Sequence, residues 1–593
     1  MRKKLLLMIL LFTGLVNAQI LTFTDTTFKA MLVNGGANNF TASSGGVDVT
    51  RIDTNFNNEI EVSEAALIDK LWIEGANASQ VTNIQGIEGF TNLTDLGFRE
   101  ISVTSINLSG MPNLKTLFVK SPTLVTATVS GMNALTGASF MENPLLETLN
   151  ISNNPLQTTI LAQQNPGFST FNVNNLPLLK DFYVADNVLT ALDITGCPNV
   201  EYFNAVNNQL TSMNVSGLTK LTTFLIEDNT NLSSINAAGC TLLNFPQSAF
   251  NSTKVLTTAD FSNCSSLEYI LFPDNTLTSL NLSGCSALKD VNVSNNALTT
   301  LPLTGCTALT NLNCTNNQLT ALNLSTSPNL VQLQASTNAI SNLNLTGTTN
   351  LKNTFLNSNQ IPSLNLSGNT NLEILELREN PTTNLNLSGC TALNNVSLVD
   401  TNLVTANFSN CSSLTYIGNI STALTSINVQ GCTALETLSI SGKPLEKAPL
   451  AALNVSGLAN LKSLDCSYNT VSSLNLSGCS ALTSVFCIET PITAIDFSDS
   501  PNIITLNVNG SALENIDLSG FTNFQTLSAS SNPNLKMIFA KNGKTETLFL
   551  GNANTNLAFV CQDEADIIAT KNYLLTVGLS NVEVNSYCSF TPG

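Results

Sequence analysis

The sequence predicts an all-β-dominated solenoid of about 22 short coils, closed by an N-terminal and a C-terminal cap. The first observation is that one apolar position recurs every 21 residues, at Leu280, Leu301, Leu322, Leu343, Leu364 and Leu385. With gaps of mostly 21 or 22 residues, the same position can be followed from Ile84 to Met537. The second observation is that apolar and polar residues alternate inside each unit, as in short strands. One such unit cannot bury its leucine face alone, so neighbouring units must stack.

Each unit carries two similar halves. The first half reads Leu309-x-x-Leu312-x-Cys314-x-x-Asn317, and the second half repeats the theme as Leu319-x-x-Leu322-x-Leu324. This half-period of about ten leaves no room for a helix, so we expect strands on both sides of each coil. An asparagine side chain can bond turned backbone groups, and the equivalent residues Asn317, Asn338, Asn359 and Asn380 are therefore expected to form a buried ladder. We expect the half with Leu312 and Cys314 to line the concave side.

Composition divides the chain into four parts. Residues 1–18 have a basic start, an apolar run and a small-residue end at Ala18, which predicts a secretory signal and an exported protein. Residues 19–83 form the N-terminal cap, 84–540 the solenoid and 541–593 the C-terminal cap. No later stretch has the 18 or more apolar residues of a membrane helix. With 40 acidic and 22 basic residues, the net charge of −18 argues against nucleic acid and anionic lipid as partners.

The N-terminal cap holds a candidate metal site. Asp25 precedes a segment with helical apolar spacing, which predicts a short helix, and a second helix is expected near Val62. Between them, oxygen donors follow the spacing of an EF-hand calcium loop: Asp53, Asn55, Asn57, Glu59, Glu61 and Glu64. Asn58 stands where that loop has glycine, which asparagine can replace because it tolerates positive φ. The two hypotheses are one structural Ca²⁺ and a turn rich in asparagine and aspartate without metal.

The cysteines divide into two groups. Nine of them share one register of the repeat: Cys197, Cys240, Cys264, Cys285, Cys306, Cys390, Cys411, Cys432 and Cys479. Cys314, Cys466 and Cys487 occupy the inward strand position, and all twelve are interpreted as small buried apolar residues. In the C-terminal cap, Leu557–Cys561 and Val582–Cys588 read as strands around an amphipathic helix. The two cap cysteines of an exported protein, Cys561 and Cys588, are expected to form a disulfide.

The repeat resembles the leucine-rich repeat, and this resemblance covers most of the chain. The signal, the asparagine-rich units of 21 residues and the Cys-helix-Cys cap are similar to secreted leucine-rich repeat proteins of Bacteroidetes, flavobacteria especially. The resemblance implies a protein found outside the cell or on the outer surface of the outer membrane.

The sequence argues against an enzyme. Without any histidine, Ser/His and Cys/His catalysis is excluded, although carboxylate chemistry is not. The best acidic candidates are the Glu373–Glu379 cluster and the pair Asp496 and Asp517, which could approach each other from successive coils. In the cluster, Glu376 and Arg378 share a face and are expected to form an ion pair. We predict no catalytic residue, and a glycan-active enzyme is only a remote alternative.

The favoured function is recognition or adhesion, with a protein or polysaccharide bound on the solenoid face. Outward residues of the first half are the candidate ligand contacts, because aromatic residues are enriched at recognition surfaces: Phe118, Lys120, Tyr183, Phe355, Glu376, Arg378 and Phe486. The alternative is a structural accessory subunit docked in an outer-membrane complex. A large exposed apolar patch would favour the second function, and a polar groove with scattered aromatic residues the first.

Overall fold

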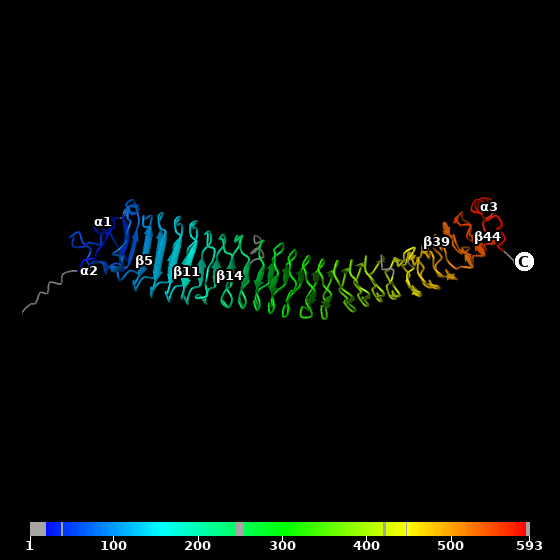
Figure 1. The fold of residues 1–593 in the computed structure, drawn as a ribbon, viewed down its shortest axis with the longest axis horizontal. Helices are drawn as coiled ribbons and strands as arrows, with labels where there is room; N and C mark the ends of the chain where they lie inside the picture. The colour runs from blue at the N-terminus through cyan, green and yellow to red at the C-terminus, as the bar shows by residue number, and fades with distance from the viewer. Residues whose placement is uncertain (1–18, 37–38, 245–253, 419–422, 446, 589–593) are drawn as a thin grey trace, which may run out of the picture. The chain divides into compact units, whose positions relative to one another are not determined.

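The computed structural model describes residues 19–36, 39–244, 254–418, 423–445, 447–588. The signal segment lies outside these residues, as do parts of the two irregular spacings in the repeat, at 245–253 and 446. The chain forms two compact units, 1–267 and 268–593, each of which is a parallel β-solenoid (Figure 1). Together they contain about 24 turns. No helix among the described residues has the length and apolar character needed to cross a membrane.

Unit 1 begins with the predicted N-terminal cap. Helix α1 (Thr26–Asn34) starts where expected, because the Asp25 side chain accepts a hydrogen bond from the Phe28 N–H at 2.9 Å. Helix α2 (Val62–Ala65) follows the candidate calcium loop, and the strands β1 (Phe40–Ser44) and β2 (Val47–Val49) form an antiparallel hairpin. The cap leads into the solenoid without a break, since β3 (Lys70–Ile73) pairs antiparallel with β1 and parallel with the first repeat strand, β4 (Asp95–Arg99).

The two halves of each unit form strands on two separate faces, as the nested period predicted. We call these the first-half face and the second-half face. In unit 1 the first-half face contains β3 (Lys70–Ile73), β4 (Asp95–Arg99), β6 (Thr116–Lys120), β8 (Gly137–Ser139), β10 (Thr159–Leu161), β12 (Asp181–Tyr183), β13 (Tyr202–Asn204) and β15 (Thr223–Leu225). Its second-half face contains β5 (Ser105–Ser109), β7 (Thr126–Ser130), β9 (Thr148–Ser152), β11 (Thr170–Asn174), β14 (Ser212–Asn214), β16 (Ser234–Asn236) and β17 (Thr258–Asp260).

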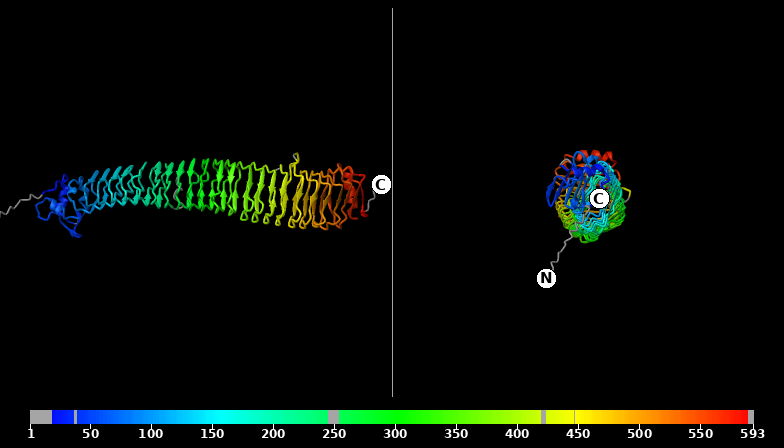
Figure 2. Two further views of the ribbon diagram at one scale, coloured as in Figure 1. Left: turned by 90° about the horizontal axis from the view of Figure 1, so that it is seen from below. Right: turned by 90° about the vertical axis from the view of Figure 1, so that its left-hand side faces the viewer.

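Unit 2 repeats this plan, and the turned view in Figure 2 shows its coils following one another. Its first-half face contains β18 (Tyr269–Leu271), β20 (Asp290–Asn292), β21 (Asn311–Asn313), β23 (Gln332–Gln334), β25 (Asn353–Phe355), β27 (Ile374–Glu376), β29 (Asn395–Ser397), β31 (Tyr416–Ile417), β33 (Thr437–Ser439), β35 (Ser463–Asp465), β37 (Ser484–Phe486), β39 (Thr505–Asn507), β41 (Thr526–Ser528) and β43 (Thr547–Phe549). Its second-half face contains β19 (Ser279–Asn281), β22 (Ala321–Asn323), β24 (Asn342–Asn344), β26 (Ser363–Asn365), β28 (Asn384–Asn386), β30 (Thr405–Asn407), β32 (Ser426–Asn428), β34 (Leu453–Asn454), β36 (Leu474–Asn475), β38 (Ile495–Asp496), β40 (Asn515–Asp517), β42 (Met537–Phe539), β44 (Phe559–Cys561) and β45 (Glu583–Asn585).

The core lies between the two faces of each coil. Leu309, Leu312 and Leu319 of one unit are at most 1% exposed, because successive strands pair in register and stack identical positions. The predicted asparagine ladder is confirmed. The Asn359 carbonyl oxygen accepts from the Ile340 N–H at 3.0 Å, and its amide donates to the Ala335 and Leu356 carbonyls at 2.9 and 3.0 Å.

The cysteines and the C-terminal cap also follow the prediction. All twelve cysteines within the repeats are buried thiols, and several donate to a carbonyl of the preceding coil, as Cys411 does to Leu387. Burial raises the pKa of the Cys314 thiol to about 12. Cys561 and Cys588 form the expected disulfide. Helix α3 (Ile567–Thr576) covers the end of unit 2, where the Tyr573 hydroxyl donates to the Leu550 carbonyl at 2.8 Å.

Candidate functional site

The outward side chains of the first-half face form straight rows, since alternate residues of a strand point away from the core. In unit 1 one outward position of each strand pairs in a continuous register. We call these residues the unit 1 outer row: Trp72, Gly97, Phe118, Ser139, Leu161, Tyr183, Asn204 and Leu225. The five large apolar members of this row are half-buried. They stand on the solvent side of the sheet, so core packing alone does not account for them.

Trp72 and Phe118 form an aromatic platform at one end of the row. Their ring centroids lie 5.3 Å apart and the rings are stacked, although a whole strand separates them. Gly97 permits this contact, because a Cβ atom there would lie 2.3 Å from the Trp72 indole. The Arg99 guanidinium lies 5.5 Å from the Trp72 ring and 5.4 Å from the Phe118 ring, while the Trp72 N–H donates to Asp95 at 2.8 Å.

Lys120 lies beside this platform, directly across from Arg99 in the strand register. Its ammonium group contacts Glu142 at 2.8 Å and Glu100 at 3.6 Å. The hydrogen bond to Glu142 raises the pKa of Lys120 above its ordinary value. Lys120 is therefore held in an ion-pair network at the edge of the row.

Tyr183 belongs to a second aromatic pair. Its ring centroid lies 4.8 Å from that of Tyr202 on the next strand, at an angle of 30°. Burial raises the pKa of Tyr183. Leu161 and Leu225 belong to the same row, so the pair continues an apolar strip along the face. Sequence reasoning missed Tyr202, because it occupies the first strand position, and also Trp72, because it precedes the recognisable repeats.

The candidate residues of unit 2 occupy a more polar face. Phe355 and Glu376 are neighbours in an outer row that otherwise holds Leu271, Asn292, Asn313, Gln334 and Ser397. Phe486 stands in a separate set of strands, between Asp465 and Asn507. The structure therefore does not bring Phe355 and Phe486 together.

The ion pair expected between Glu376 and Arg378 is absent from the described residues, and that prediction is wrong. Asn357 of the preceding coil takes both partners instead: its amide donates to the Glu376 carboxylate, and its carbonyl oxygen accepts from the Arg378 backbone N–H at 2.9 Å. The Asn357 amide can do this because it has both a donor and an acceptor, whereas the Arg378 guanidinium can only donate. The Arg378 side chain is left exposed.

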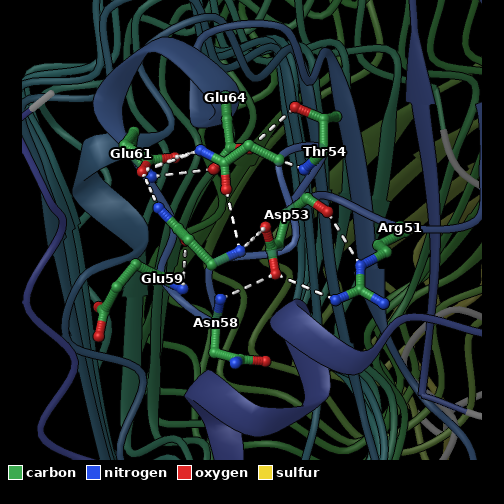
Figure 3. A network of polar contacts seen from close by, with 9 residues as sticks. Arg51, Asp53, Thr54, Asn58, Glu59, Glu61 and Glu64 are labelled. Carbon is green, nitrogen blue, oxygen red and sulfur yellow. Dashed lines mark hydrogen bonds and ion pairs between the residues drawn. The ribbon is translucent and has the colours of Figure 1, made fainter.

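The candidate calcium loop is closed by hydrogen bonds (Figure 3). Asp53 is fully buried, contacts Arg51 at 3.0 Å and accepts from the Asn57 and Asn58 N–H groups. Burial by itself would raise the pKa of Asp53, but the bonds from Arg51 and the backbone lower it below its ordinary value. Asn58 has the positive φ of 66° that its position requires.

The remaining donors of the loop also have protein partners. The Glu64 carboxylate accepts from the Thr54 and Glu61 backbone N–H groups, Glu61 accepts from the Asn55 and Asn57 amides, and the loop residue Glu59 pairs with a lysine of α1. In the described part of the chain no three acidic or thiol side chains are arranged to hold a metal ion. As arranged, the donors do not fit a bound cation, since Arg51 already supplies the positive charge. The calcium site stays a prediction.

The acidic cluster Glu373–Glu379, which raised the remote possibility of an enzyme, bonds to neighbouring side chains of the solenoid. Glu373 forms an ion pair with Lys352 at 3.2 Å, and Glu379 accepts a hydrogen bond from Ser358. Together with the Asn357 contact to Glu376, these bonds give each of the three carboxylates a partner on a neighbouring coil.

Comparison with known proteins gives a likeness of fold. No family model matches the chain, and no curated protein matches it. Among solved structures, the functional domain of InlJ from Listeria monocytogenes is 18% identical, with 82% of this chain and 76% of that chain covered and a TM-score of 0.30. YopM from Yersinia enterocolitica is 19% identical, with 82% and 88% covered and a TM-score of 0.33. The leucine-rich repeat protein LIC12759 of Leptospira interrogans is 14% identical, with 88% and 97% covered and a TM-score of 0.21.

Sequence identities and TM-scores this low give no information about function. The repeated 21-residue unit, its two strands and its asparagine ladder are seen directly in the structure. On those features the chain is a parallel β-solenoid whose 21-residue coils are like leucine-rich repeats.

Proposed function

We propose that this protein is a non-enzymatic, exported recognition module that binds a protein or polysaccharide through the unit 1 outer row. The observation that carries the proposal is the row itself. It places Trp72, Phe118 and Tyr183 with two leucines on the solvent side of a sheet, whereas the corresponding row around Phe355 is mostly asparagine, glutamine and serine. Aromatic residues and arginine supply most of the binding energy at protein interfaces, and aromatic rings also pack on sugars.

The proposal places the protein outside the cell or on the outer surface of the outer membrane. Its support is the basic, apolar and small-residue order of residues 1–18, together with one disulfide in the C-terminal cap. The alternative, a subunit docked in an outer-membrane complex, predicts an apolar surface larger than this row.

Trp72 provides a direct test, because it is the only tryptophan in the chain. The full chain would be screened on arrays of surface polysaccharides and against a displayed peptide library, and each hit titrated while Trp72 emission is recorded. We expect a hit to change the emission. The substitutions Tyr183→Asn and Tyr202→Thr should weaken binding about tenfold or more, as expected for interface hot spots. Both variants should fold, because Asn204 and Thr223 occupy the same two positions on the next strands.

The matched control is Phe549→Ser, which removes an exposed aromatic residue from the first-half face of unit 2. It should bind like the unaltered protein. The role of this row would be disproved if every ligand found bound with unchanged emission and with equal affinity to the tyrosine variants. Isolation from the native membrane in constant stoichiometry with an outer-membrane protein, without any array hit, would favour the docked subunit.

A further inference from the structure

The second-half face of unit 2 is interrupted between β38 and β40. Strands β34, β36 and β38 pair in register, and a new ladder starts with β40 and β42, while no pairing joins β38 to β40 among the described residues. On the first-half face of the same coils the ladder continues through β37, β39 and β41. The coils thus stay stacked on one side and separate on the other.

Aromatic side chains gather at this interruption. The register that holds Cys479 reaches Ser500 one coil later and Phe521 in the coil after that. Phe521 is buried, and its ring centroid lies 5.4 Å from that of Phe497 and 5.8 Å from that of Phe524. The described strands of this face are also unpaired between β24 and β26 and between β32 and β34, so the interruption is one of several.

A cavity of about 800 Å³ lies at the interruption. Four of the apolar side chains that line it are half-exposed: Ile495, Phe497, Met537 and Phe539. In the preceding, intact coil the residues equivalent to the first two, Leu474 and Leu476, are 5% and 1% exposed. The gap therefore uncovers Ile495 and Phe497, whose positions the repeat otherwise buries. Beside them stand Met537 and Phe539, at the outward positions that Asn515 and Asp517 hold on the paired strand.

Carboxylates stand next to these apolar side chains in fixed positions. Asp496 and Asp517 replace the usual asparagine, and each accepts the N–H of the serine two residues later, Ser498 or Ser519, at 2.9 Å. Their second carboxylate oxygens receive no hydrogen bond from the described part of the chain. Glu514, also at the cavity, pairs with Lys536 at 3.0 Å, and none of the described residues that line the cavity is basic.

We infer that this cavity binds one or two sugar residues of a neutral oligosaccharide. A pyranose ring has an apolar C–H face, which would pack on Phe497 and Phe539, and an edge of hydroxyl donors, which carboxylates bind with charge-assisted hydrogen bonds. Polysaccharides with carboxylate or sulfate groups are excluded by charge, because Asp496, Asp517 and Glu514 would repel them. The site belongs to unit 2 and does not depend on the function proposed for the unit 1 outer row.

We expect binding without hydrolysis. A glycosidase needs one carboxyl group that holds its proton near neutral pH. Hydrogen bonds from Ser498 lower the pKa of Asp496 below its ordinary value, so this group is an acceptor in neutral solution.

The test is calorimetric titration of the full chain with soluble oligomers of four to six sugars, from β-1,4-glucan, β-1,3-glucan, α-mannan and β-1,4-N-acetylglucosamine. Two variants probe the site: the double substitution Asp496→Asn with Asp517→Asn, and Phe539→Ser. Asparagine should preserve the fold at both positions, since the equivalent residues of the two preceding coils are Asn454 and Asn475. The matched controls are Asp193→Asn, which alters the same kind of turn in unit 1, and Phe549→Ser.

We expect at least one oligomer family to bind, both site variants to lose about tenfold or more in affinity, and both controls to bind normally. An oligogalacturonate of the same length should bind at least tenfold more weakly than the neutral ligand, and Trp72 emission should not change. The inference is overturned if no oligomer binds, if the site variants bind equally well, if the oligogalacturonate is preferred, or if the oligomers are cleaved. The function proposed for unit 1 is tested with Trp72 emission and the tyrosine variants, whereas this site is tested with the aspartate and Phe539 variants. Either proposal can therefore fail while the other stands.

Discussion

The asparagine ladder is the feature whose removal should cost most stability, and Asn359 is its best test. Its side chain is 1% exposed and bonds the Ile340 N–H, the Ala335 carbonyl and the Leu356 carbonyl. Asn359→Ala leaves the Ile340 N–H buried without this partner, whereas the Ala335 and Leu356 carbonyls keep the amides of Asn338 and Asn380. A buried unpaired polar group costs roughly 1–3 kcal/mol, so the substitution should lower the free energy of unfolding by about 1–3 kcal/mol.

The chain itself supplies a graded comparison. In other coils threonine holds the ladder position, and the Thr401 hydroxyl donates to the Leu398 carbonyl at 2.8 Å. Asn359→Thr should therefore cost less than Asn359→Ala. The control Asn365→Ala removes one exposed turn contact, to the Ser367 N–H at 3.1 Å, and should change stability by about 1 kcal/mol or less.

Denaturant unfolding followed by circular dichroism gives the overall effect. Hydrogen exchange at the Ile340 amide gives the local effect, which matters because repeat arrays can unfold in parts. Equal stabilities for Asn359→Ala and Asn365→Ala, or unchanged protection of the Ile340 amide, would show that the ladder does not hold the coils together.

Three further predictions concern the two ends of the chain. Burial raises the pKa of Glu546 to about 7, above the ordinary value of 4.5, so the C-terminal cap should be most stable below pH 4.5 and lose about 1–3 kcal/mol as the pH rises through 7. Glu546→Gln should abolish this dependence in pH-resolved unfolding curves. Cys588→Ser opens a disulfide that spans 27 residues and should destabilise the cap by about 3–4 kcal/mol, measured as its susceptibility to proteolysis; a cap equally resistant without the bond would contradict this. If the loop around Asp53 binds calcium, millimolar Ca²⁺ should raise the melting temperature relative to EDTA, and Glu64→Gln should remove that shift; identical melting curves would show that the loop is held by Arg51 and its hydrogen bonds without a metal.

The repeat could be predicted in detail because its evidence is periodic. The register of Asn317, Asn338, Asn359 and Asn380 is repeated so often that their shared position and burial follow from spacing. The caps were predicted for a different reason. Asp25 carries a helix-capping signal of its own, and Cys561 and Cys588 were the only cysteines outside the repeats.

Features that depend on contacts between coils were not predictable in the same way. The sequence assigned the Glu376 side chain to the correct face but did not identify Asn357 as its partner. Whether the carboxylate bonds a neighbour on its own strand or one on the preceding coil depends on side-chain geometry. Trp72 shows no periodic signal because it precedes the recognisable repeats, and its stacking on Phe118 depends on the missing Cβ of Gly97.

The sequence by itself determined the solenoid, its two faces, the asparagine ladder and the burial of the cysteines, because each of these follows from one short pattern repeated in register. Only the tertiary structure decided where that regularity is broken and what the break exposes. The 21-residue spacing continues through β38 and β40, yet these two strands do not pair, and a cavity lined by Phe497, Phe521 and Phe539 lies between them. The physical reason is that a repeat specifies the average coil, whereas the packing of one coil on the next depends on the particular side chains that meet there.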